Sequence, residues 1–161
     1  MATIQFKKGD AYLAKIEKLG AASKDDICGS AIYGAEDIVT GEIRSQLDRV
    51  PTDERYGTMS DPTAGPRKGQ VKALKASLGI AKMQDSGGYL HVKIGWDGYN
   101  QIKTKRWPNG EPNQMVARSI ERGTSFMKAN AFVKKAVSSS RKRAIATMKQ
   151  IVDAKCEEIM K

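Results

Sequence analysis

The side chains that most often do chemistry in proteins are scarce in this sequence of 161 residues. It holds one histidine, His91, and two cysteines, Cys28 and Cys156. Two cysteines and one histidine do not complete a tetrahedral zinc shell, and two cysteines do not make a disulfide framework. We therefore expect no structural metal, and we expect each cysteine to be a small buried apolar residue of a helix.

Two short runs resemble catalytic groups without supplying a complete set. Ser138–Ser140 places three hydroxyls in a row, but a single histidine leaves few ways to build a nucleophile–base pair. Asp25 and Asp26 look like paired carboxylates, yet the helix dipole alone favours acidic residues in a first helical turn. The sequence contains neither a Gly-x-x-x-x-Gly-Lys-Ser/Thr phosphate loop nor a dinucleotide fingerprint. We therefore expect no catalytic residues, no cofactor and no enzyme activity.

Positive charge is concentrated in the last third of the chain. Residues 1–100 carry 14 Lys and Arg against 13 Asp and Glu, whereas residues 101–161 carry 14 against 5. Of the overall net charge of +10, +9 therefore lies after residue 100. Such a basic segment indicates a polyanionic neighbour, nucleic acid first, and it suits an acidic protein surface equally well.

Length and composition predict one globular domain over residues 1–161. The sequence contains no stretch of about 20 apolar residues, so we expect no membrane span. The first eight residues are not followed by an apolar run, so we expect no signal peptide and a cytosol-like compartment.

Apolar periodicity and capping residues predict five helices. Ser23 and Asn113 are typical N-cap residues, and Gly123 is expected to end a helix in the left-handed αL conformation. Three glycines of the second helix indicate close backbone packing against another element: Gly29, Gly34 and Gly41. The predicted helices cover residues 10–19, 23–49, 68–78, 114–122 and the last 30 residues.

The middle of the chain predicts strands and loops. Alternating apolar residues indicate a strand over 89–96, with His91 on its polar, exposed side. Shorter strands are expected over 3–6 and 80–83, and long polar loops are expected over 51–67 and 99–112. The fold class that follows is α+β, with a small antiparallel β-sheet packed against long N- and C-terminal helices.

The last helix carries two separate stripes. Val137, Ala144 and Ile151 recur every seven residues and are expected to face the core. Lys135, Lys142 and Lys149 recur with the same spacing, displaced by two residues or about 200° around the helix, so they are expected to point outward. Such lysines can form an ordinary solvated face or a surface that meets DNA.

The two tryptophans are expected to differ. Trp96 ends an apolar strand and Phe132 begins an apolar helix, so both are expected in the core. Trp107 lies between Arg106 and Pro108 in a polar loop and is expected to be more exposed. A loop tryptophan beside a cation is a candidate interface anchor.

Two segments, taken together, resemble a known family. The first is His91-Val92-Lys93-Ile94-Gly95-Trp96-Asp97-Gly98-Tyr99-Asn100. The second is Ala117-Arg118-Ser119-Ile120-Glu121-Arg122-Gly123-Thr124-Ser125, followed by Ala131-Phe132-Val133-Lys134-Lys135-Ala136-Val137. In order and spacing they resemble the tail-completion, or head–tail joining, proteins of long-tailed bacteriophages and prophages.

The resemblance implies a structural virion protein without cofactor or catalysis. Such proteins are expected to form a homo-oligomeric ring, typically sixfold, at the neck between the tail terminator and the head-completion protein. The genome passes along the axis of that junction, so non-specific DNA contact in the lumen is expected. The chain would be assembled in the host cytoplasm and would end in the virion.

Seven residues are candidates for contacts in such an assembly: Trp107, Glu121, Gly123, Thr124, Lys135, Lys142 and Lys149. For Glu121, Gly123 and Thr124, a plain helix stop and turn is the alternative interpretation.

The sequence alone also leaves other functions open. They are a basic nucleic-acid-binding module outside virions, the neighbouring tail-terminator role, and a small hydrolase, which the missing base–nucleophile set disfavours.

Overall fold

The computed structural model describes residues 9–21 and 24–161 of the chain. The strand predicted at 3–6 and the N-cap predicted at Ser23 lie outside these residues. The helices are α1 (Gly9–Ala21), α2 (Lys24–Asp48), α3 (Lys68–Ser77), α4 (Asn113–Arg122) and α5 (Phe132–Met160). The strands are β1 (Leu78–Ile80), β2 (Gln84–Asp85), β3 (Leu90–His91) and β4 (Ile94–Trp96). Each predicted helix of residues 9–161 is present, with ends close to those expected.

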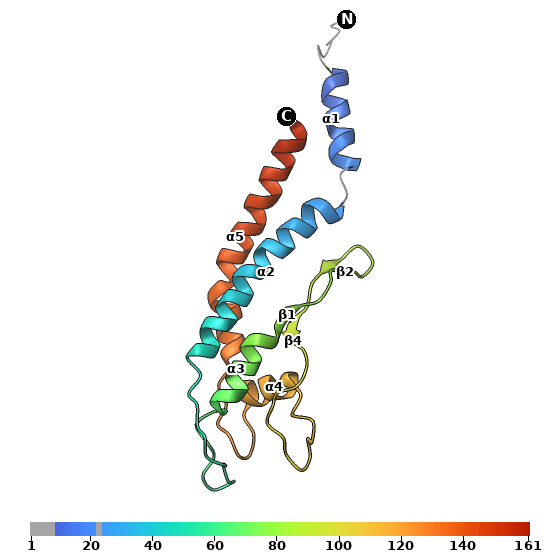
Figure 1. The fold of residues 1–161 in the computed structure, drawn as a ribbon. Helices are drawn as coiled ribbons and strands as arrows, with labels where there is room; N and C mark the ends of the chain where they lie inside the picture. The colour runs from blue at the N-terminus through green and yellow to red at the C-terminus, as the bar shows by residue number, and fades with distance from the viewer. Residues whose placement is uncertain (1–8, 22–23) are drawn as a thin grey trace, which may run out of the picture.

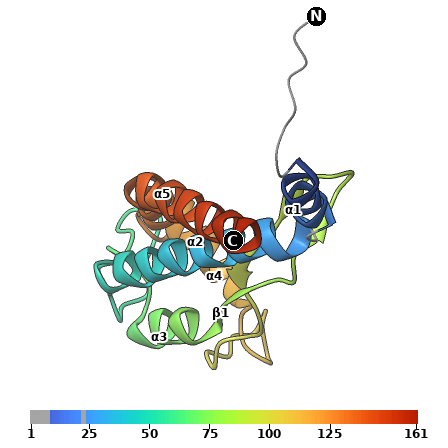
Figure 2. The same ribbon diagram turned by 90° about the horizontal axis from the view of Figure 1, so that it is seen from above.

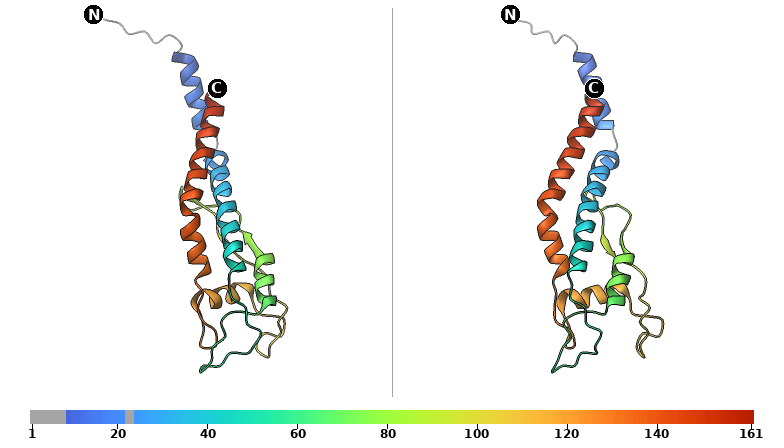
Figure 3. Two further views of the ribbon diagram at one scale, coloured as in Figure 1. Left: turned by 90° about the vertical axis from the view of Figure 1, so that its left-hand side faces the viewer. Right: turned by 60° about the vertical axis from the view of Figure 1, so that its left-hand side comes forward.

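Two long helices form the axis of an elongated molecule. α2 and α5 lie antiparallel and side by side, and α1 lies beyond the start of α2, near the end of α5 (Figures 1 and 3). α2 lies between α5 and α3 (Figure 2). α3, α4 and the two long loops gather at the end of the molecule opposite to α1 (Figure 1).

The described strands form two small antiparallel sheets, and with the helices they make an α+β fold as predicted. β1 pairs with β4, with Leu78 opposite Trp96, and β2 pairs with β3, with Gln84 opposite His91. The register changes by one residue between the two pairs, which places one extra residue in the 78–85 strand. An extra residue of this kind is a β-bulge, and it bends and twists the ribbon.

The bulge explains why the strand predicted over 89–96 is divided. It lies near Met83, whose backbone N–H donates to the Tyr33 hydroxyl at 3.2 Å. Because α2 holds this point of the ribbon, pairing stops on one side of it and resumes on the other. The bulge also changes which face each side chain takes, and His91 is half-buried and stacked on Tyr89 rather than exposed.

The core lies where the second half of α2 and the first turns of α5 meet α3 and α4. Phe132, Leu47, Leu74 and Ile120 are fully buried there. Trp96 packs against this cluster and meets Phe132 edge-on, with ring centroids 5.8 Å apart. Both aromatic residues therefore belong to the core or its border, as predicted.

Glycines allow close packing of α2 at two of the three positions singled out. A Cβ on Gly34 would lie 2.3 Å from Ile151 Cδ1 of α5, and a Cβ on Gly29 would lie 3.0 Å from Met83 Cε. A Cβ on Gly41 would meet nothing within 4 Å. Close packing therefore accounts for Gly34 and Gly29 and not for Gly41.

The face that α5 buries differs from the predicted one at its start. Val137 is 45% exposed, whereas Ala136 and Ser140 are fully buried. The buried residues Phe132, Ala136, Ser140 and Ala144 follow a spacing of four, which keeps them against α2. A pattern of apolar residues does not include Ser140, which can be buried because its hydroxyl donates to the Ala136 carbonyl at 2.7 Å within the helix.

Two helix-end predictions for α4 also need correction. Asn113 is the first helical residue rather than the cap, and its side-chain amide donates to the Asp97 carbonyl at 2.9 Å. Gly123 does end the helix with positive φ, but its φ of 74° and ψ of 173° lie outside the αL region. That combination is almost restricted to glycine.

Candidate functional site

The three predicted lysines lie on the outer face of α5. Lys135, Lys142 and Lys149 are all exposed, as predicted. Lys135 Nζ donates to Asn130 Oδ1 at 3.2 Å, whereas within the described residues no ion pair involves Lys142 or Lys149. Lys142 and Lys149 therefore keep their positive charge available to an external group.

Trp107 lies at the far end of the 99–112 loop from the core. It is half-buried, like Trp96, so the expected difference in exposure is not seen. The Arg106 guanidinium carbon lies 5.7 Å from the centroid of the Trp107 ring, within the range of a cation–π interaction. The loop thus presents an aromatic ring and a cation together.

Glu121 has a clear local role at the corner between α4 and α5. Its carboxylate oxygens accept the backbone N–H groups of Val133 at 2.8 Å and Lys134 at 3.1 Å, in the first turn of α5. These N–H groups have no partner inside the helix, so a carboxylate there acts as a cap. Glu121 therefore joins the end of one helix to the beginning of the next.

Gly123 and Thr124 complete this corner. A Cβ on Gly123 would lie 2.8 Å from the Ala129 nitrogen, so only glycine fits the turn. Thr124 and Met127 exchange two backbone hydrogen bonds, and the Thr124 hydroxyl accepts the Phe126 N–H at 3.2 Å. The Glu121-x-Gly123-Thr124 segment is thus a helix stop and turn, and a contact with a neighbouring subunit stays a prediction.

The 51–67 loop has a fixed shape, set by ion pairs and by contacts with the α4–α5 corner. Arg55 pairs with Asp53 at 3.0 Å and with Asp61 at 2.9 Å, and the hydrogen bonds from Arg55 lower the pKa of Asp53 to about 2. Thr63 donates its N–H to Phe126 O at 2.9 Å and accepts the Lys128 N–H at 2.9 Å. The loop therefore presents a surface whose shape is held by these ion pairs and hydrogen bonds.

The predicted candidates do not converge on one place. The lysines follow the outer face of α5, the Glu121 corner lies at its start, and Trp107 belongs to the loop that follows β4. They form three separate surfaces, which suits several contacts with neighbours better than one binding pocket.

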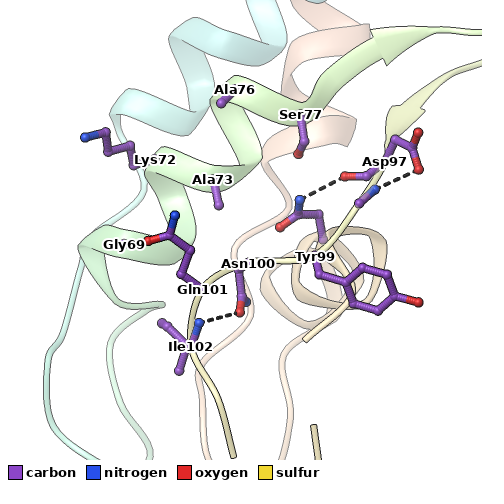
Figure 4. A pocket seen from close by; sticks show the side chains of 12 residues that line it. Gly69, Lys72, Ala73, Ala76, Ser77, Asp97, Tyr99, Asn100, Gln101 and Ile102 are labelled. Carbon is purple, nitrogen blue, oxygen red and sulfur yellow. Dashed lines mark hydrogen bonds between the residues drawn. The ribbon is translucent and has the colours of Figure 1, made fainter. Parts of the chain in front are cut away.

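A second feature, which sequence reasoning missed, is a groove beside α3 and the β1–β4 sheet. One part, of about 500 Å³, lies between α3 and residues 97–102 (Figure 4). A second part, of about 610 Å³, lies over β1 and β4. Ser77 and Asp97 line both parts, so the two parts adjoin. From here on, "the α3–sheet groove" denotes these two parts together.

Unpaired polar atoms cluster at the α3–sheet groove. Among the described residues, five buried side-chain atoms have no hydrogen-bond partner, and four belong to groove residues. They are Ser77 Oγ, Trp96 Nε1, Asn100 Nδ2 and Asn113 Oδ1. Each unpaired buried group costs about 1–3 kcal/mol, so their clustering needs an explanation.

The hydrogen bonds around the groove fix which end of each amide is unpaired. Asn100 Oδ1 accepts the backbone N–H groups of Ile102 at 2.9 Å and Glu111 at 3.2 Å, which leaves Nδ2 as a free donor. Asn113 Nδ2 donates to the Asp97 carbonyl, which leaves Oδ1 as a free acceptor. With the Trp96 indole and the Ser77 hydroxyl, the residues that line the groove carry both unpaired donors and unpaired acceptors, each buried at the atom itself.

The sequence held one signal for the groove. Trp96, Asp97, Tyr99 and Asn100 belong to the first of the two motif segments. Asn113 and Ser77 come from other segments, and no local pattern connects them with Asn100.

In the part of the chain that the structure describes there is also no metal site, no disulfide and no membrane-spanning helix. No group of three or more His, Cys, Asp or Glu among residues 9–21 and 24–161 is arranged to hold a metal ion. Cys28 and Cys156 are free thiols and half-buried, so they are less buried than expected. Of the described helices, none is both long enough and apolar enough to cross a bilayer.

In comparisons with known proteins, no family model, no curated protein and no solved structure matches this chain.

Proposed function

We propose that the chain is a structural subunit of a ring at the head–tail junction of a long-tailed phage, where it joins the tail to the head. The family-specific part of this proposal rests on the two motif segments at 91–100 and 117–137. Its assembly part rests on the shape of the molecule.

The observation that carries the assembly part is the accessible surface. The chain exposes 11413 Å², whereas a compact monomer of 17.6 kDa exposes about 7,900 Å². The excess of the first area over the second is about 3,500 Å². Residues 1–8 and 22–23, which the structure does not describe, account for at most about 1,600 Å² of this excess, the area of ten fully exposed residues. A surplus of about 2,000 Å² or more remains, which is comparable to two protein–protein interfaces of about 800 Å² per partner.

A ring needs this kind of surplus. Each subunit of a closed ring makes two different contacts, one with each neighbour. The long α2–α5 pair, the outlying α1 and the two loops provide separate surfaces for them (Figure 3). Exposed apolar side chains occur on α1 (Leu13, Ile16), on the loops (Tyr56, Met59, Tyr99) and on α5 (Val137, Ile145).

The proposed partners are further copies of this chain, the tail terminator and the head-completion protein. The exposed lysines of α5 suit a sequence-independent contact with genomic DNA in the lumen. The expected location is the neck of the virion, after assembly in the host cytoplasm. The tail-terminator position is the nearest alternative within the virion.

A basic nucleic-acid-binding module outside virions has weaker support. Such modules interleave aromatic side chains with cations so that bases stack on them. The only aromatic residue of α5 is Phe132, which is fully buried. The lysine face of α5 therefore offers charge without stacking platforms.

The genetic test removes the gene from the phage or prophage that carries it and supplies it again on a plasmid. Loss of the protein is expected to give filled heads and finished tails that are not joined, and complementation is expected to restore infectious particles. Normal numbers of joined particles without the protein would overturn the proposal. Detection of the protein by mass spectrometry in purified virions separates a resident component from an assembly factor.

A further inference from the structure

The α3–sheet groove has the features of a site for an extended polypeptide. Its floor is made largely of small residues, among them Gly69, Ala73 and Ala76 of α3 and Gly79 and Gly95 of the sheet. A Cβ on Gly79 or on Gly95 would meet nothing within 4 Å. A backbone can therefore approach the floor closely without a clash.

The sheet beside the groove also has free edges. Ala81 N–H donates to Lys93 O at 2.8 Å, and Asp97 N–H donates to Ser77 O at 3.3 Å. Along an antiparallel pair, only every second residue forms backbone hydrogen bonds with the partner strand. The N–H and C=O groups of Ile80 and Ile94 therefore point away from the partner strand. Only two described strands form this sheet, so its edges can accept another extended segment.

The unpaired atoms support the same ligand chemistry. A polypeptide backbone presents alternating N–H and C=O groups, and residues that line the groove carry the unpaired donors Asn100 Nδ2 and Trp96 Nε1 and the unpaired acceptor Asn113 Oδ1. The charged residues at the groove are Lys72, Lys93 and Asp97. The groove thus fits an extended stretch of chain that is bound mainly through its backbone groups.

We propose that the α3–sheet groove binds the N-terminal segment, residues 1–8, of a second copy of this chain. This inference rests on the proposed ring, because it assigns one of the contacts between neighbours. In the segment, Thr3 and Gln5 alternate with Ile4 and Phe6, a pattern typical of a strand with one apolar side.

The length of the segment matches the groove. From Gly69 to Ser77 the floor follows α3 for about 12 Å, and from Ser77 to Ile80 it follows β1 for about 10 Å. About seven extended residues cover this distance at about 3.3 Å each. Eight residues precede α1, which begins at Gly9.

Geometry favours a second copy over the same copy. α1 lies at the opposite end of the molecule from α3 (Figures 1 and 3). To reach even the sheet end of the groove, close to Met83 and therefore beside Tyr33 of α2, the segment would have to pass along α1, about 20 Å, and the first part of α2, about 14 Å. Eight extended residues reach only about 26 Å.

The experiment places a photoreactive amino acid, p-benzoylphenylalanine, at position 6 of the full chain. Isotopically labelled and unlabelled chains are mixed at high concentration and irradiated, and the cross-linked peptides are identified by mass spectrometry. We expect cross-links of mixed isotope composition that join position 6 to residues 69–80 or 94–102. Cross-links within one chain only, cross-links to other regions, or none in solution and in purified virions would overturn the proposal.

Two variants that fill the groove sharpen this test. Gly95→Val adds a side chain over the sheet, and Ala76→Leu adds one on exposed α3, so at least one is expected to fold normally by circular dichroism. A folded variant is expected to lower the cross-link yield about tenfold, equivalent to about 1.4 kcal/mol. Gly41→Ala, whose new Cβ also meets nothing, is the control and should leave the yield unchanged. Rings that still form with an unchanged yield in folded groove variants would refute the groove contact and leave the neck proposal standing.

Discussion

The carboxylate of Glu121, near the end of α4, accepts the backbone N–H of Val133 in the first turn of α5 at 2.8 Å. A second hydrogen bond, from the Lys134 N–H at 3.1 Å, engages the other oxygen. This one side chain therefore fixes the angle at which the longest helix leaves the core. It also gives a physical reason for the glutamate in the second motif segment.

Replacing Glu121 with alanine is expected to lower the free energy of unfolding by about 1–2 kcal/mol, the usual effect of losing a helix cap. Urea denaturation measures it. Glu121→Gln is the matched control, because its side-chain oxygen still accepts one hydrogen bond, and it should lose less. Equal stability of all three proteins would contradict a capping role.

Replacing Gly34 with valine is expected to destabilise the chain by about 1–3 kcal/mol, because the new side chain meets the end of the Ile151 side chain of α5, which has to move. Thermal unfolding measures the change. Gly41→Ala in the same helix meets nothing within 4 Å and is expected to raise stability by about 0.5–1 kcal/mol. Similar effects at both positions would show that helix propensity, rather than contact with α5, decides.

The helices were predictable from the sequence because their signals are local. Apolar spacing and flanking Gly and Pro residues gave α2, α3, α4 and α5 close to their observed ends. The division of β3 from β4 was not predictable, because the bulge at Met83 depends on Tyr33, which lies 50 residues earlier. Val137 was misplaced because the apolar pattern does not recognise a buried serine such as Ser140.

The candidate sites show the same division. The outward lysines of α5 follow from helical periodicity alone and are exposed as predicted. The α3–sheet groove depends on Ser77, Asn100 and Asn113, which meet only after α3, the sheet and α4 are packed. Which of their atoms lack a hydrogen-bond partner depends on the three-dimensional packing, so it cannot be predicted from composition or spacing.

Glu36 is expected to make stability depend on pH. Its side chain is 3% exposed, Oε1 has no partner, and burial raises the pKa of this carboxyl from its usual value of 4.5. A raised pKa in the folded state means that the stabilising, protonated form is complete below pH 4.5 and is lost as the pH rises through the folded pKa. Ionised Glu36 therefore weakens the fold at neutral pH.

Glu36→Gln is accordingly expected to raise stability at pH 7 by about 1 kcal/mol and to have little effect at pH 4. Urea denaturation of the variant and the unmodified chain at both pH values measures the difference. Glu158→Gln, at an exposed position of α5, is the control and should show no such trend. A variant less stable than the unmodified chain at pH 7 would contradict this account.

Replacing Lys135, Lys142 and Lys149 together with glutamate is expected to leave the monomer folded, because all three are exposed. If this face meets DNA, binding of the unmodified chain to double-stranded DNA should be independent of sequence and should weaken steeply with salt. The variant should lose that binding and form fewer infectious particles.

A control for charge alone replaces the exposed Lys18 of α1, Lys82 between β1 and β2, and Lys161 just beyond the end of α5. It should retain most of the DNA binding and infectivity. Normal infectivity of the α5 variant would show that its lysines form only a solvated face.

Replacing Trp107 with alanine is expected to reduce joined, infectious particles at least several-fold while changing stability by less than about 1 kcal/mol, because the ring is outside the core cluster and lies beside Arg106. Complementation assays with plasmid-borne variants measure it. Tyr89→Ala, which removes an aromatic ring that is 70% exposed in the β2–β3 turn, is the control. If both variants join heads and tails normally, the 99–112 loop is not a contact surface.

The most direct test of the central proposal is a cryo-electron microscopy reconstruction of the neck of the virion that encodes this chain. We expect a closed ring of identical subunits between the head-completion and tail-terminator layers, in which the antiparallel α2–α5 pair and the α3–α4 end fit the density of each subunit. DNA should occupy the axis of that ring. A neck whose density is fully explained by other proteins, with no ring of this fold, would contradict it.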